Sequence, residues 1–122
     1  MSTRQRGDKV ELFAEKHLKK QGLALIEKNF NSRYGEIDLI MLDGLILVFV
    51  EVRFRANTSF GSGAETVDYR KQQKIIKTAQ LYLQSNKKMQ QRDCRFDVVS
   101  VTLASHEPMI EWHQNAFQAS AW

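Results

Sequence analysis

Two carboxylates and an arginine stand at a spacing that could support metal-dependent hydrolysis. Asp38 lies in one apolar run, and Glu51 and Arg53 lie in the next. Carboxylate oxygens are ligands that Mg²⁺ prefers, and a bound Mg²⁺ polarises a phosphodiester and lowers the pKa of its water. A cation such as Arg53 would stabilise the negative charge that builds up in the transition state. Alone, this pattern also fits an ordinary surface ion-pair cluster.

A predicted β-hairpin carries these residues. Two apolar runs, 36–42 and 45–52, are separated by Asp43 and Gly44. Asp-Gly is among the strongest short hairpin signals, because a type I′ turn needs positive φ at both central positions. The strands are apolar at nearly every position near the turn, which indicates that both faces of the sheet are covered.

The register of the hairpin decides which side chains share a face. With Asp43 and Gly44 in the turn, Glu36 opposes Glu51, and Asp38 is a diagonal neighbour of Glu51, roughly 7–8 Å away at the backbone. Alternate residues along a strand share a face, so Glu36, Asp38, Glu51 and Arg53 all project from one side of the sheet. Three acids against one arginine favour a divalent cation as the compensating charge.

The surrounding elements follow from hydrophobic periodicity and from capping and turn residues. In chain order we predict a helix over 8–21, strands over 23–30, 36–42 and 45–52, a helix over 67–85, a strand over 95–103 and a short edge strand over 109–112. The order is α-β-β-β-α-β-β, an α/β fold. We expect a single domain over 1–122, with flexible tails at the first few residues and over 114–122.

The first predicted helix and one loop complete the candidate site. Asp8 is the expected N-cap, with Glu11 three residues later as in a capping box. Glu11 and Glu15 lie one turn apart, and either could face the acidic end of the sheet. The composition of residues 55–64 predicts a mobile loop that could close over a substrate.

Positive charge is concentrated in one segment. The chain has 18 Lys+Arg against 14 Asp+Glu, a net charge of +4, yet the segment 69–92 contains no acid. Its basic residues are Arg70, Lys71, Lys74, Lys77, Lys87, Lys88 and Arg92. Arg70, Lys74 and Lys77 lie on one helix face, where they could contact phosphates. This distribution favours a polyanion such as nucleic acid as partner, although a solvated helix face would look the same.

Several protein classes are disfavoured by composition. The 122 residues contain no apolar run near the roughly 20 that a membrane helix needs, and the N-terminus does not resemble a secretory signal. Cys94 is the single cysteine, so neither an intramolecular disulfide nor a cysteine-based zinc site is available. The three histidines share no metal-ligand spacing. We expect a cytoplasmic protein.

Four segments carry a family resemblance: Gly35–Ile40, Leu47–Arg55, Phe60-Gly61 and Arg95–Val99. They resemble the YraN family, also called UPF0102, small bacterial proteins that are similar to archaeal Holliday-junction resolvases. The likeness extends from about residue 7 to about residue 101. It implies the restriction-endonuclease-like fold of the PD-(D/E)XK superfamily, a mixed central sheet flanked by helices.

The resemblance also implies roles for individual residues. Asp38 and Glu51 match the metal-binding acids, Glu11 matches an additional acid of the resolvase branch, and Arg53 stands where the superfamily usually has lysine. The metal would be Mg²⁺ or Mn²⁺. Glu36 belongs to the family's motif without an assured catalytic role. The expected nucleic-acid contacts are Arg55, Arg70, Lys71, Gln72, Lys74 and Lys77.

The leading hypothesis is therefore a divalent-metal-dependent DNA endonuclease, with branched or structured DNA as its candidate substrate and a homodimer as its candidate assembly. Arginine stays protonated, so Arg53 could stabilise charge but could not act as a base. The first alternative is a nucleic-acid-binding module with a weak or inactive site. The second is a protein-interaction adaptor with an incidental acidic cluster.

Overall fold

The computed structural model describes residues 2–56, 67–103 and 106–119, and two helices and five strands account for most of them. The elements are α1 (Thr3–Lys20), β1 (Ala24–Ser32), β2 (Gly35–Asp43), β3 (Ile46–Arg55), α2 (Tyr69–Ser85), the 3₁₀ turn η2 (Lys87–Met89), β4 (Cys94–Thr102) and β5 (Met109–Phe117). The predicted order α-β-β-β-α-β-β is confirmed. None of the helices within the described ranges is long and apolar enough to cross a membrane.

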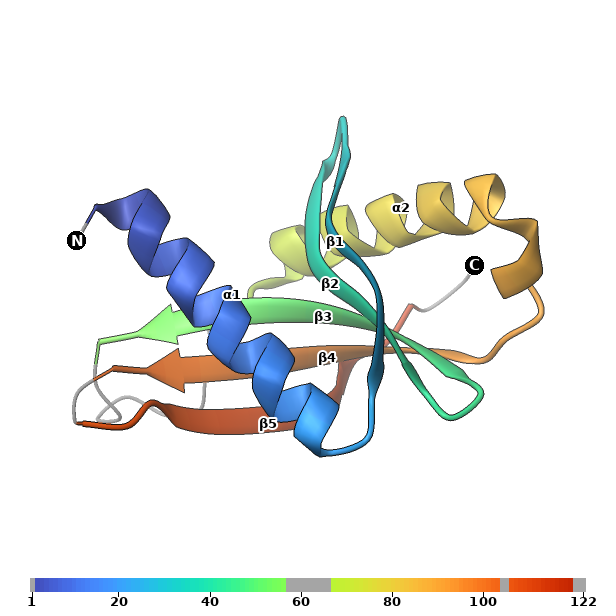
Figure 1. Cartoon of the computed structure of the whole chain (residues 1–122). Coiled ribbons are helices and arrows are strands. Elements are labelled where there is room, and N and C mark those ends of the chain that lie inside the picture. Colours follow the sequence, from blue (N-terminus) through green and yellow to red (C-terminus); the bar gives the residue numbers. More distant parts are fainter. Residues whose placement is uncertain (1, 57–66, 104–105, 120–122) are drawn as a thin grey trace.

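The five strands form one mixed sheet in sequential order, β1-β2-β3-β4-β5. Neighbouring strands are antiparallel except β3 and β4, which are parallel and are connected through α2. Figure 1 shows α1 and α2 on opposite faces of this sheet. The predicted cover on both faces is therefore confirmed, and the architecture is a central mixed sheet flanked by helices.

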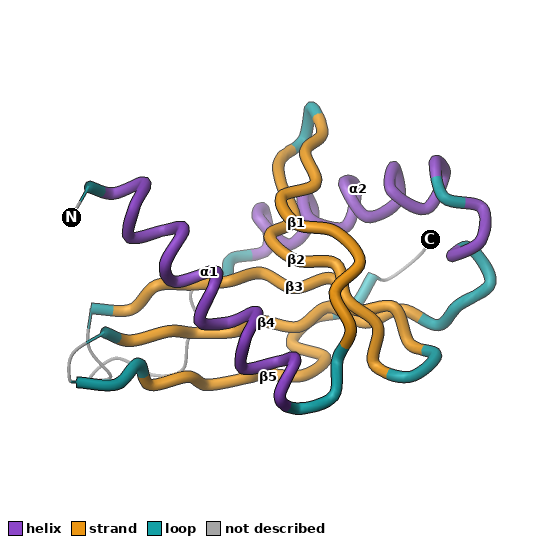
Figure 2. The backbone as a smooth tube through the Cα atoms, viewed as in Figure 1, coloured by secondary structure: helices purple, strands orange, loops and turns teal. Residues whose placement is uncertain are grey.

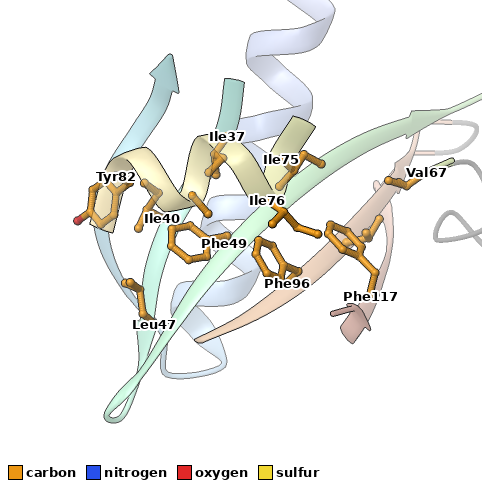
Figure 3. Packing of buried hydrophobic residues seen from close by; sticks show 12 residues of the cluster. Ile37, Ile40, Leu47, Phe49, Val67, Ile75, Ile76, Tyr82, Phe96 and Phe117 are labelled. Carbon is orange, nitrogen blue, oxygen red and sulfur yellow. The ribbon is translucent and has the colours of Figure 1, made fainter. Parts of the chain in front are cut away.

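The face covered by α2 is rich in aromatic residues. Tyr82 packs edge-on against Phe30 and Phe49, with ring centroids 5.3 and 6.0 Å apart. The stack continues from Phe49 through Phe96 to Phe117 (Figure 3). Such ring pairs are stabilising beyond the apolar area that they bury. Through Tyr82 this layer packs α2 against β1 and β3, and α2 also contacts β2.

On the other face, α1 packs its own apolar stripe against the sheet. Val10, Ala14 and Leu18 are buried against β2 and β3, including Leu39 and Val48. The helix begins at Thr3, five residues before the predicted start. The reason is a capping box, in which the Gln5 N–H donates to the Ser2 hydroxyl at 3.1 Å and the Ser2 N–H to the Gln5 side chain at 2.9 Å.

The predicted hairpin turn is displaced by one residue. Asp43 pairs with Ile46, so the two turn residues are Gly44 and Leu45, and the predicted opposition of Glu36 and Glu51 is wrong. Gly44 has φ +61°, which places glycine at the first central position, as a type II′ turn prefers. Asp43 instead pairs with Arg95 at 2.9 Å. The partner of every β2 residue moves by two positions, and the side chains keep their faces.

The last strand extends further than predicted. β5 continues to Phe117, so residues 114–117, expected to belong to a flexible tail, are in the sheet. Asp97, which is fully buried on β4, accounts for this extension. Its carboxylate accepts hydrogen bonds from Trp112 Nε1 at 2.9 Å, from the Asn115 N–H at 2.9 Å and from Arg95 Nε at 3.0 Å. Asn115 has φ +52°, and the β4–β5 register shifts beside it.

Candidate functional site

The site begins where β2 separates from β3. The β2–β3 ladder ends at the pair Leu39–Val50. One residue beyond, the side chain of Asp38 accepts a hydrogen bond from the Val52 N–H at 2.8 Å. A carboxylate thus occupies the place of a backbone acceptor. The β1–β2 hairpin then turns away from β3, as the tube in Figure 2 shows.

Two further acids meet Asp38 at this point. Glu11 from α1 and Glu36 from β2 each offer a carboxylate oxygen, and these oxygens and one from Asp38 all lie within 4.8 Å of one another. With its amide oriented so that the nitrogen faces the acids, Asn29 donates to Glu11 at 3.0 Å and also to Glu36. Asn29 has φ +55°, a conformation that asparagine tolerates better than most residues. The group therefore combines side chains from α1, β1 and β2.

Glu51 adds a fourth carboxylate from β3. It is only 6% exposed, and its side chain is hydrogen-bonded to that of Asp38. The ammonium of Lys71, in the first turn of α2, lies 2.9 Å from a Glu51 oxygen. Lys71 therefore brings a positive charge from the helix directly to the carboxylates of the sheet.

Burial and neighbouring acids raise the pKa of three of these carboxyls. Burial is the largest cause of the pKa of Asp38 rising to about 9, followed by the hydrogen bond and the charge of Glu51. Burial and the neighbouring Glu36 raise the pKa of Glu11, and burial and Glu51 raise that of Glu36. Asp38 consequently keeps a proton at neutral pH in the metal-free protein. The cluster is short of positive charge, which a divalent cation would supply.

Three of the four acids line a cleft with a volume of about 590 Å³. Glu36, Asp38 and Glu51 lie on its sheet side. Arg70 and Lys71, together with Lys74 one turn later, come from α2. The acids of the sheet thus face the start of α2, where these three cations outnumber one acid, the N-cap Asp68. A metal-assisted reaction on a phosphodiester needs such a combination of acids and cations.

Most of the predicted site residues are brought together here. Asp38, Glu51 and Glu11 meet as predicted, and Glu11 rather than Glu15 faces the sheet edge. Glu15 instead pairs with Lys19 at 2.6 Å and Lys28 at 2.9 Å, and these hydrogen bonds lower its pKa.

Other predicted contacts lie elsewhere. Arg53 is half-buried opposite Ser100 of β4, and it is not among the described residues that line the cleft. Arg55 is 7% exposed, with a guanidinium nitrogen 3.8 Å from Glu111, so its burial does not fit the predicted nucleic-acid contact. The side chain of Gln72 donates to the Val67 carbonyl at 2.9 Å. The predicted mobile loop falls mainly on 57–66, outside the described residues.

Sequence reasoning did not find every residue of the site. It assigned Glu36 no ligand role and did not consider Asn29. An asparagine within a strand-like run, followed by the turn 31–35, was the one available signal, because asparagine favours irregular backbone. Lys71 was expected to contact nucleic acid, and the structure places it against Glu51.

Comparison with known proteins finds one family and several relatives that match most of this chain. The model of a family described as "Uncharacterised protein family UPF0102" matches residues 10–101, a range that includes Glu11, Asp38, Glu51 and Lys71. A UPF0102 protein of Stutzerimonas stutzeri is 48% identical over 113 residues, covering 93% of this chain and 94% of the relative. A UPF0102 protein of Pseudomonas aeruginosa is 46% identical over 120 residues, covering 97% and 96%. One of Saccharophagus degradans is 49% identical over 111 residues, covering 91% of each.

Proposed function

The chain belongs to the uncharacterised protein family UPF0102, and we propose that it is a divalent-metal-dependent endonuclease that hydrolyses phosphodiester bonds in DNA. One observation carries the proposal: carboxylates from α1, β2 and β3 converge where β2 leaves β3, and those of β2 and β3 line a cleft together with basic residues of α2. The basic segment supports a polyanionic substrate, and the acids support a hard cation with oxygen ligands.

The donor set fits Mg²⁺ or Mn²⁺, because every candidate ligand is a carboxylate. Asp38 and Glu51 would hold the ion, with Glu11 and Glu36 as additional oxygen ligands. When bound, such an ion polarises the phosphodiester and lowers the pKa of coordinated water. The Val52 N–H fixes the Asp38 carboxylate, and Arg70 and Lys74 attract the DNA backbone toward the acids.

Cleavage of a branched DNA substrate tests the proposal. We expect the wild-type protein to cut in Mg²⁺ or Mn²⁺ and not in EDTA. Glu51→Gln should reduce cleavage to the EDTA background, since it removes a charged ligand from the cleft. Glu27→Gln is the matched control, because it neutralises an exposed acid outside the cleft and should cut like the wild type.

Two results would contradict the proposal. The first is undiminished cleavage by Glu51→Gln, which would place the reaction elsewhere. The second is salt-sensitive DNA binding by the wild type without turnover in either metal. That second result would identify a nucleic-acid-binding module that does not cut. The sequence argument for this alternative is Arg53, which stands where the superfamily usually has lysine.

Lys71, rather than Arg53, is expected to supply the positive charge at the scissile phosphate. Lys71 lies 2.9 Å from Glu51, whereas Arg53 is not among the described residues of the cleft. We expect Lys71→Ala to reduce the cleavage rate roughly 100-fold, the usual effect of removing a preorganised charge-stabilising donor. Lys87→Ala, an exposed lysine at the end of the same basic segment, should change the rate less than twofold, roughly the size of a screened surface charge effect.

The same cleavage assay applied to Arg53→Lys separates the two residues. If Lys71 carries the role, restoring the usual lysine at position 53 should neither replace the lost activity of Lys71→Ala nor raise that of the wild type. If adding Arg53→Lys restores the cleavage rate of Lys71→Ala, the residue at position 53 supplies the positive charge at the scissile phosphate.

A further inference from the structure

A second hollow adjoins the acidic cleft, and we call it the basic–aromatic groove. Its volume is about 470 Å³, and its lining includes Arg33, Tyr34, Tyr69, Arg70, Lys74 and Lys77. Tyr34, Arg70 and Lys74 also line the acidic cleft, so the two hollows are continuous. A chain of phosphates that reaches the carboxylates can therefore extend along α2 into the groove.

The charge of the groove suits a polyanion. Four of its lining residues are cations, and among the described residues that line it none is acidic. The neighbouring cleft differs because it carries Glu36, Asp38 and Glu51 on its sheet side. Phosphates would therefore be attracted to the groove itself, independently of any metal.

Contacts between the hairpin and the helix hold the groove in shape. The ring of Tyr34, in the β1–β2 turn, has the Lys77 ammonium 5.3 Å and the Arg33 guanidinium 4.9 Å from its centroid. Nearby, the hydroxyls of Ser32 and Thr78 are 2.8 Å apart in a part-buried hydrogen bond. The Tyr34 wall is therefore preorganised against α2.

Tyr69 differs from the other large side chains of the groove. It is the first residue of α2 and is 73% exposed, beside Arg70 and across from the Tyr34 wall. An exposed ring among cations is the arrangement on which single-stranded nucleic acids stack their bases. In continuous duplex the bases are stacked on one another, so a flat ring could reach them only after they had been separated.

We propose that the basic–aromatic groove binds an unpaired segment of DNA next to the phosphate to be cut, with a base stacked on Tyr69 and phosphates held by Arg70, Lys74 and Lys77. This inference rests on the proposed function and specifies its substrate. The enzyme acts where a strand leaves a duplex, at a branch, flap or frayed end, and disfavours continuous duplex.

Binding in EDTA tests the inference without cleavage. Fluorescence anisotropy is measured with a labelled single strand and with a continuous duplex of the same length. The wild type should bind the single strand more tightly than the duplex. Tyr69→Ala should weaken binding of the single strand roughly tenfold, the size of one lost stacking contact, and change duplex affinity less than about twofold.

Three further variants complete the design. Tyr69→Phe keeps the ring and should bind like the wild type. Lys74→Ala should weaken both DNAs and reduce the salt dependence of binding by about one phosphate contact. Leu45→Ala removes an apolar side chain that is 79% exposed in the β2–β3 turn, away from the groove. It should leave the affinity for both DNAs unchanged.

The outcomes separate this inference from the proposed function. Equal effects of Tyr69→Ala on the single strand and the duplex, or no effect on either, would overturn the stacking role. Tyr69-dependent binding of the single strand without any Mg²⁺-dependent cleavage would support the groove and refute the nuclease. Absence of binding to both DNAs at low salt would overturn both.

Discussion

Replacing Asp38 by asparagine is expected to make the metal-free protein more stable at neutral and alkaline pH. Folding raises the pKa of the Asp38 carboxyl from 3.8 to about 9, chiefly by burial and by Glu51. The folded state therefore keeps a proton that the unfolded state has lost, so stability falls as pH rises between these values. Asparagine is always neutral and can still accept the hydrogen bond from Val52.

The expected difference is large. One retained proton changes the free energy of unfolding by up to about 1.4 kcal/mol per pH unit. Between pH 5 and pH 8 the wild type should lose stability relative to Asp38→Asn at a slope approaching this value. Urea unfolding at a series of pH values measures both slopes. Parallel slopes for the two proteins would show that Asp38 ionises freely in the folded state.

Divalent metal should reverse the order of stability. A cation bound to the ionised Asp38 carboxylate takes the place of the proton that Asp38 otherwise keeps, and a ligand that binds the folded state alone raises its stability. Mn²⁺ should therefore raise the melting temperature of the wild type more at pH 8 than at pH 6, with a smaller shift for Asp38→Asn. Asp38→Asn should also cut DNA no faster than the EDTA control. An equal Mn²⁺ shift in both proteins would exclude Asp38 as a ligand.

Asp97→Ala is expected to cost about 3–5 kcal/mol of stability, as is typical when one partner of a buried charged network is removed. Asp97 is completely buried and accepts hydrogen bonds from Arg95, Trp112 and the Asn115 backbone. Alanine would leave the Trp112 and Asn115 donors without their acceptor and would remove one of the two carboxylates that pair with Arg95. The β4–β5 pairing beyond Trp112 depends on this carboxylate, so we expect β5 to loosen first.

Denaturation in urea and hydrogen exchange of the β5 amides measure the loss. Asp43→Ala is the matched control, because it removes the other carboxylate partner of Arg95 at a site that is 40% exposed. An exposed pair of this kind contributes roughly 1 kcal/mol or less. If the two variants lose similar free energy of unfolding, the burial of Asp97 does not add to its contribution to stability.

The hairpin illustrates how far sequence reasoning reached. Asp43 and Gly44 indicated a two-residue turn, and the turn is formed by Gly44 and Leu45. Because side chains alternate with a period of two, a displacement that changes each pairing by two positions leaves every side chain on its predicted face. The shared face of Asp38 and Glu51 was therefore predicted correctly from an incorrect register.

The errors have a common physical origin in tertiary contacts. Arg55 follows Arg53 in an alternating pattern that gives no sign of burial, yet it is buried near Glu111 of β5, a strand expected to be short. Asn29 joins the site through a positive φ that periodicity cannot reveal. Local sequence patterns were enough to predict the helices and strands and which side chains share a face. The positions of Arg55 and Asn29 depend on contacts with residues far away in the chain, which local patterns do not reveal.

The hydrogen bond between Ser32 and Thr78 has a mechanical consequence. It joins the tip of the β1–β2 hairpin to the middle of α2, so it restrains the two sides of the opening that leads to the carboxylates from separating. An opening restrained in this way does not widen when nucleic acid binds. We expect the nucleic acid to deform instead, and the energy needed to bend or splay it would then set which molecules are processed.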